Sequence, residues 1–126
     1  MNKVNKTTPR SRFFASFNYA FSGFRVALQQ EINFRVFAVV AVVVLVSAFL
    51  LEVSMEEWMV LIVVIGLNLM AELFNTALEL LCDRVSSKKD PAIHAIKDIS
   101  AAAVLVFVIT AVVVGWLIFL PKLLEL

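Results

Sequence analysis

The stretch AELFNTALELLCDR (residues 71–84) decides how the rest of the sequence is interpreted. It continues the apolar run WMVLIVVIGLNLM (residues 58–70) without a break, and yet it contains Glu72, Asn75 and Glu79. A charged side chain near the centre of a bilayer costs about 2.5–3.5 kcal/mol on insertion scales. These groups therefore need partners inside the protein, and function is the usual reason for keeping them there.

The composition is that of an integral membrane protein. Of the 126 residues, 62% are hydrophobic, against about 45–50% apolar residues in a soluble domain. The mean hydropathy is +0.95. The length predicts a single domain over residues 1–126, and the net charge of +1 gives no sign of a nucleic-acid partner.

Three segments are long enough and apolar enough to cross a membrane. A helix needs about 20 residues to cross about 30 Å of hydrocarbon, and in lipid the backbone must form its own hydrogen bonds. The predicted spans cover about residues 32–51, 57–83 and 96–120. The predicted fold is therefore all-α with three transmembrane helices.

A further helix is predicted before the first span, at about residues 10–29. Apolar side chains recur there at steps of three and four residues, at Phe13, Phe17, Phe21, Phe24 and Leu28. This spacing is typical of an amphipathic helix that lies in a membrane interface. The alternative is a helix in the core of a soluble protein.

The distribution of charge predicts the topology. Basic residues gather in the N-terminal segment (Lys3, Lys6, Arg10, Arg12, Arg25 and Arg35) and around the second loop (Arg84, Lys88, Lys89 and Lys97). The loop near residue 55 carries only acids, at Glu52, Glu56 and Glu57. The positive-inside rule then places the N-terminus and the second loop in the cytoplasm, and the C-terminus outside.

The polar residues of the second span share one face. At about 100° per residue, with Glu72 as zero, Glu79 falls at about −20°, Asn68 at about −40°, Asn75 at about −60° and Asp83 at about +20°. They therefore occupy an arc of about 80°. This face points away from lipid, into the protein or a wet cleft.

A cluster at the cytoplasmic boundary predicts phosphoryl-transfer chemistry. The cluster draws its members from three predicted helices: Glu31, Asn75, Glu79, Lys97 and Asp98. Carboxylate and amide oxygens suit Mg²⁺, and a lysine can hold a phosphate. Glu72, about 10 Å deeper, can take a proton from a lipid hydroxyl. The sequence has neither a P-loop nor a kinase-type glycine loop.

Simpler explanations remain open for each of these residues. Lys97 and Asp98 can form an interfacial ion pair, Asn68 and Asn75 can bond across helices, and Glu31 can pair with Arg35 one turn later. The rival functions are a small proton-coupled transporter built on Glu72 and a structural membrane subunit whose polar stripe joins helices.

Two motifs resemble the prokaryotic diacylglycerol kinase family, which includes the undecaprenol kinases. The family pattern E-x-x-N-[ST]-A-[IL]-E-x-x-x-D matches from Glu72 to Asp83, and K-D-x-x-[AS]-[AG]-A-V matches from Lys97 to Val104. The segment SGFRVALQQEINFR (residues 22–35) resembles a third family motif, and the resemblance covers roughly residues 12–122.

The resemblance implies a homotrimer that uses ATP and Mg²⁺. By position, Glu31 and Glu79 would bind Mg²⁺ with help from Asn75, and Glu72 would be the catalytic base. The nucleotide would contact these three Mg²⁺ residues together with Arg12, Lys97 and Asp98, and the lipid would contact Glu72 and Asn75. Such an enzyme would lie in the cytoplasmic (inner) membrane as a multi-pass protein.

The second loop departs from the family pattern. Relatives often carry an acid and a histidine where this chain has Lys88 and Asp90. Pro91 and the ending IFLPKL (residues 118–123) look more like the undecaprenol kinase branch. We therefore expect an ATP-dependent kinase that phosphorylates the primary hydroxyl of a membrane lipid, with undecaprenol favoured over diacylglycerol.

Overall fold

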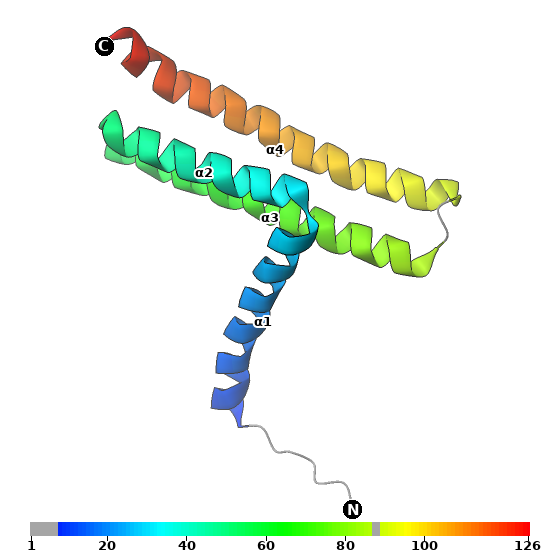
Figure 1. Ribbon diagram of the computed structural model, residues 1–126. Coiled ribbons are helices and arrows are strands. Elements are labelled where there is room, and N and C mark those ends of the chain that lie inside the picture. Colours follow the sequence, from blue (N-terminus) through cyan, green and yellow to red (C-terminus); the bar gives the residue numbers. More distant parts are fainter. Residues whose placement is uncertain (1–7, 87–88) are drawn as a thin grey trace, which may run out of the picture.

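Within residues 8–86 and 89–126, which the computed structural model describes, the chain forms four α-helices (Figure 1). They are α1 (Pro9–Gln30), α2 (Ile32–Leu50), α3 (Met55–Val85) and α4 (Pro91–Leu124). Helices α2, α3 and α4 are long and apolar enough to cross a membrane. The prediction of an all-helical protein with three candidate spans is therefore confirmed. Lys3, Lys6 and Lys88 lie outside the described residues.

Local sequence fixes where α3 and α4 begin. Ser54 and Glu57 form a capping box, in which each side chain bonds the backbone N–H of the other residue. Asp90 accepts a hydrogen bond from Ala92 N–H, and Pro91 occupies the first turn. These caps start both helices a few residues before the apolar runs that defined the predicted spans.

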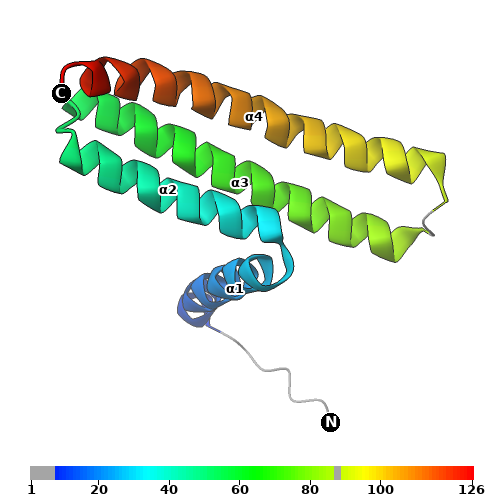
Figure 2. The ribbon, with the colours of Figure 1, turned by 45° about the horizontal axis from the view of Figure 1, so that its top comes forward.

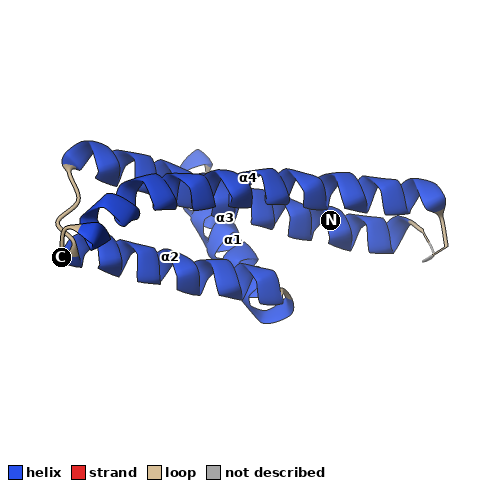
Figure 3. Ribbon diagram, turned by 90° about the horizontal axis from the view of Figure 1, so that it is seen from above, coloured by secondary structure: helices blue, strands red, loops and turns tan. Residues whose placement is uncertain are grey.

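The bundle is formed by α2, α3 and α4, which lie side by side and alternate in direction (Figures 1 and 2). Helix α3 contacts the three other helices. Helix α1 leaves the bundle at a steep angle where α2 begins, as the view from above also shows (Figure 3). The turn between α2 and α3 and the C-terminus share one end of the bundle, and the loop between α3 and α4 lies at the other.

A cluster of buried apolar side chains lies at the end of the bundle that holds the C-terminus. The core cluster there consists of Ala48, Val53, Leu61 and Ile118. An ion pair between Lys122 Nζ and Glu57 Oε2, at 3.0 Å, joins α4 to α3 at the same end. Most other large apolar side chains are exposed on the single chain, as expected of helices that face lipid.

Helix α1 covers the residues predicted to form the surface helix. Its aromatic side chains at Phe13, Phe17 and Phe21 are exposed, and Ala27 is its buried residue. The exposed aromatics are available to a bilayer or to another chain.

Candidate active site

The most buried polar side chain in the described chain is that of Glu72, which is 1% exposed. Glu72 lies in the part of α3 that follows its most apolar run, one turn before Thr76, which is 5% exposed. Burying a carboxylate is costly unless it is paired, protonated or bound to a cation. A side chain of this kind inside a long apolar helix is a strong candidate for a functional group.

Two other predicted carboxylates lie within electrostatic range of Glu72. Glu31 and Glu79 are both near enough to act on it electrostatically. Glu31 occupies the break between α1 and α2, where its backbone turns extended and its side chain makes no capping hydrogen bond. Its carboxylate is therefore not used to start α2. Glu72, which was predicted to lie about 10 Å deeper than Glu79, is thus within electrostatic range of both carboxylates.

Three buried polar atoms follow one another along α3 without a hydrogen-bond partner among the described residues. They are Asn68 Oδ1, Glu72 Oε1 and Thr76 Oγ1. Their spacing of four residues puts them on one face of the helix. Buried polar atoms are almost always paired in folded proteins. This row therefore marks a place where a ligand, a cation or water is expected.

Helix α4 supplies two polar contacts to the same region of α3. Ser100 Oγ donates a hydrogen bond of 2.7 Å to Asn75 Oδ1. Lys97 Nζ forms an ion pair with Asp83 Oδ1, and it also lies within electrostatic range of Glu79. Asn75 therefore does bond across helices.

The partner of Lys97 is Asp83 on the neighbouring helix and not its chain neighbour Asp98, which had been left open as a possible ion-pair partner. Adjacent residues on a helix point in different directions, so Lys97 and Asp98 do not face each other. The side chain of Asp98 is exposed.

Arg12 is a predicted site residue that lies far from the bundle in the single chain. It lies in the first turn of α1, at the end of that helix farthest from the bundle (Figure 1). Ala27, the buried residue of α1, comes 15 residues later, which is about 22 Å along the helix axis.

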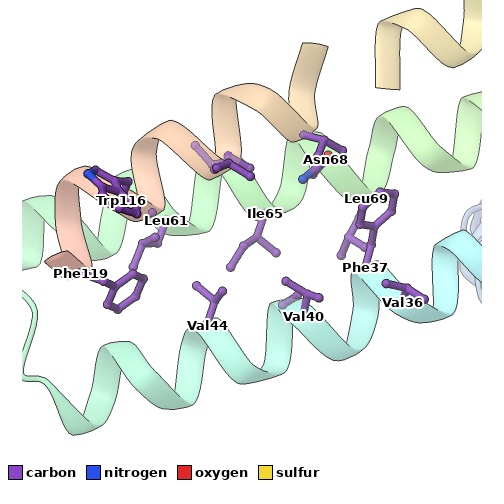
Figure 4. Close-up of a pocket in the computed structure, with 16 residues that line it drawn as sticks. Val36, Phe37, Val40, Val44, Leu61, Ile65, Asn68, Leu69, Trp116 and Phe119 are labelled. Atoms are coloured by element: carbon purple, nitrogen blue, oxygen red, sulfur yellow. The ribbon is translucent and has the colours of Figure 1, made fainter. Parts of the chain in front are cut away.

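An apolar cleft of about 400 Å³ opens between α2, α3 and α4 on the side of Glu72 toward the C-terminal end of the bundle (Figure 4). Its walls include Val40 and Val44 of α2, Ile65 of α3 and Phe119 of α4. Asn68 is the amide in this lining, and its Oδ1 is one of the unpartnered atoms. The cleft has the dimensions and chemistry of a place for a hydrocarbon chain.

A second hollow lies between α1 and α3. Its volume is about 560 Å³, and it is lined by Gly23, Phe24 and Ala27 of α1 and by Thr76 and Leu80 of α3. Thr76 is thus buried at the wall of a space that faces α1. The buried threonine, one turn from Glu72, borders both the carboxylate group and this hollow.

Two functional candidates, Thr76 and Ser100, were not identified from the sequence. Thr76 lies four residues after Glu72, about 40° from it on the helix wheel and just beyond the polar arc, so its position was a usable signal. Ser100 gave a weaker signal, because a serine in an apolar helix commonly bonds the backbone of its own preceding turn. Within the described residues no group of three or more His, Cys, Asp or Glu side chains is arranged to hold a metal ion.

Comparison with known proteins gives a consistent match over nearly the whole chain. The family model for prokaryotic diacylglycerol kinase matches residues 18–119. The undecaprenol kinase of Bacillus subtilis is 42% identical over 123 residues, which cover 98% of this chain and 100% of that protein. The diacylglycerol kinase of Pseudomonas aeruginosa is 37% identical over 109 residues, or 86% of this chain and 88% of that protein. The diacylglycerol kinase of Escherichia coli K12 is 33% identical over 117 residues, which cover 93% of this chain and 95% of that protein.

Proposed function

The chain belongs to the prokaryotic diacylglycerol kinase family and is a lipid kinase. On that premise we propose that it transfers the γ-phosphate of ATP to the primary hydroxyl of a membrane lipid. Undecaprenol is the proposed preferred acceptor. Family membership favours a kinase over the transporter and the structural subunit considered above. The observation that carries the mechanism is the buried carboxylate of Glu72 beside Glu31 and Glu79.

Glu72 is the proposed general base. The lipid hydroxyl approaches from the bilayer, and the Glu72 carboxylate accepts its proton while the hydroxyl oxygen attacks the γ-phosphorus in line. The O–P bond to the lipid forms as the bond to the ADP oxygen breaks. Burial of Glu72 supports this role, because a site closed to bulk solvent limits the competition of water as the acceptor.

Glu31 and Glu79 are the proposed ligands of Mg²⁺, with Asn75 beside them. Mg²⁺ is usually bound through one or two protein carboxylates together with substrate phosphates and water. A pair of carboxylates therefore suffices, and a cation bound there would also reduce the repulsion that Glu31 and Glu79 exert on Glu72. The bound Mg²⁺ would offset the negative charge of the transferred phosphoryl group.

Lys97, Asp98 and Arg12 are the proposed further contacts of the nucleotide. Lys97 is a point charge suited to a phosphate, and its electrostatic interaction with Glu79 supports a role beside the proposed metal ligands. Arg12 can take part only if α1 reorients or if the site lies between chains, because its turn of α1 is far from the bundle.

Undecaprenol is preferred as the acceptor because of the likeness to the Bacillus subtilis enzyme, which covers both chains almost completely. Diacylglycerol is the second candidate, since the relatives at 37% and 33% identity carry that name. The apolar cleft between α2, α3 and α4 (Figure 4) suits a hydrocarbon tail of either kind.

The proposed setting is the cytoplasmic (inner) membrane, crossed three times, with the N-terminus and the loop between α3 and α4 in the cytoplasm and the C-terminus outside. We further propose that three copies assemble as a homotrimer. The wide apolar surface of the single chain supports burial against lipid and further copies.

Phosphate transfer from radiolabelled ATP tests the proposal. The purified protein is offered undecaprenol and diacylglycerol side by side, with and without Mg²⁺. We expect Mg²⁺-dependent transfer with a higher kcat/KM for undecaprenol. A higher kcat/KM for diacylglycerol would show that the protein forms phosphatidate. The absence of transfer to either lipid would refute both proposed acceptors.

A further inference from the structure

Ser100 makes a contact that differs from those of comparable hydroxyl residues in this chain. Ser47 Oγ bonds Val43 O and Thr110 Oγ1 bonds Val106 O, so each hydroxyl bonds the backbone of its own preceding turn. Ser100 Oγ instead reaches from α4 to α3 and donates to Asn75 Oδ1 at 2.7 Å. The bond is partly buried, which shields it from competing water.

This bond fixes both ends of the Asn75 amide. A primary amide is planar, with an oxygen that accepts and a nitrogen that carries two donors. When Ser100 holds the oxygen, the position of the nitrogen is determined as well. Among the described residues the structure gives Asn75 Nδ2 no hydrogen-bond acceptor. The amide therefore has donors available for a ligand.

Amide donors and amide oxygens serve opposite ligands. An N–H group binds a phosphate oxygen, whereas a cation requires the oxygen. Asn75 lies four residues before Glu79 and three after Glu72, so it stands between the proposed metal ligand and the proposed base. A donor at this place could meet a phosphate that Glu79 and a bound Mg²⁺ would hold.

We infer that Ser100 is a positioning residue that turns the Asn75 amide so that its nitrogen donates to a nucleotide phosphate. The inference rests on the proposed function, and it assigns Asn75 to the phosphate and leaves the cation to the carboxylates. Ser100 itself does not touch the nucleotide. It acts by holding the oxygen of Asn75.

The test compares Ser100→Ala with Ser100→Thr and Thr110→Ala in the full-length protein in lipid nanodiscs. Thr110→Ala is the matched control, because it removes a hydroxyl from the same helix that bonds its own backbone. We expect Ser100→Ala to raise the KM for ATP and the Kd for a nonhydrolysable ATP analogue about fivefold to tenfold, the effect of losing one hydrogen bond. The Mg²⁺ concentration for half-maximal rate and the kcat should change little, and Ser100→Thr should restore binding.

The substitution Asn75→Asp distinguishes whether the side chain contacts the nucleotide phosphate or the cation. The new carboxylate still accepts from Ser100, but it has no donor and repels phosphate. We expect weaker binding of the ATP analogue, with no decrease in the Mg²⁺ concentration needed for half-maximal rate. Nucleotide binding that stays normal while the Mg²⁺ requirement falls would show that the Asn75 oxygen faces the cation, and the inference would be wrong.

The failure of this inference differs from failure of the proposed function. Suppose the wild type phosphorylates lipid, but the Ser100→Ala variant binds the ATP analogue as tightly as the Thr110→Ala variant. The inference is then wrong, and Ser100 only joins the helices, even if Ser100→Ala lowers the unfolding temperature. If the wild type binds the analogue but phosphorylates no lipid, the proposed function fails while the binding comparison still decides the role of Ser100. If the wild type binds no nucleotide, both fail.

Discussion

Lys97 on α4 forms an ion pair with Asp83 on α3, and Lys122 pairs with Glu57 near the opposite end of the same two helices. The two lysines thus have the same kind of partner, but only Lys97 lies within range of a predicted metal ligand, Glu79. The pair at Lys97 is exposed enough for a phosphate to compete with Asp83, since the carboxylate side chain is 61% exposed. This difference allows one lysine to serve as the control for the other.

Lys97→Met should raise the KM for ATP by about tenfold or more, because a charged hydrogen bond to phosphate is lost. Lys122→Met removes an equivalent ion pair and should leave the KM unchanged. Initial rates at varied ATP and saturating lipid measure both. Equal effects of the two substitutions would show that Lys97 acts through helix packing.

Glu72→Gln should lower kcat by about 10²- to 10⁴-fold, the range expected for loss of a general base. The amide keeps the shape of the side chain, so binding of a nonhydrolysable ATP analogue should be nearly unchanged. Single-turnover phosphate transfer and equilibrium binding give the two readings. Turnover close to the wild-type value would exclude Glu72 as the base.

Glu79→Gln should raise the Mg²⁺ concentration needed for half-maximal rate by about tenfold, because one anionic ligand becomes neutral. Glu56→Gln, an exposed acid in the first turn of α3, is the matched control. Chelation of Mg²⁺ should abolish transfer in the wild type and in both variants. A normal Mg²⁺ dependence in Glu79→Gln would remove this residue from the metal site.

The helices were predictable because their signals are local. Length and hydropathy gave the three candidate spans, and only the caps at Ser54 and Asp90 moved the starts of α3 and α4 earlier in the chain. The electrostatic influence of Glu79 on Glu72 was also foreseeable, since the helix face that the two residues share can be counted from the sequence.

The contacts between α3 and α4 were not predictable in the same way. They depend on how the two helices are rotated about their axes, which no single helix encodes. This is why Asp83 rather than Asp98 pairs with Lys97, and why the bond from Ser100 to Asn75 was not foreseen. The remoteness of Arg12 likewise follows from the angle of α1, which depends on the break at Glu31.

Leu61→Ala should lower the unfolding temperature while leaving the KM for ATP unchanged. Leu61 is 3% exposed in the core cluster at the end of the bundle away from the carboxylates. A leucine-to-alanine change in a soluble core costs about 2–5 kcal/mol, and in a bilayer only the packing part of that cost applies, so we expect less than about 2 kcal/mol. Its neighbour Ile62, 59% exposed, gives the control Ile62→Ala, and thermal unfolding in one detergent compares them.

The proposed topology predicts which engineered cysteines an impermeant maleimide can reach. Glu56→Cys, in the first turn of α3, should be labelled on intact spheroplasts, because that end is expected to face outward. Lys89→Cys, before α4, should be labelled only after the membrane is opened. The native Cys82 is buried, 4% exposed, so the wild type gives the background for both. Labelling in the reverse pattern would place the carboxylate group on the side of the membrane away from cytoplasmic ATP, and a kinase with that topology would lack its phosphate donor.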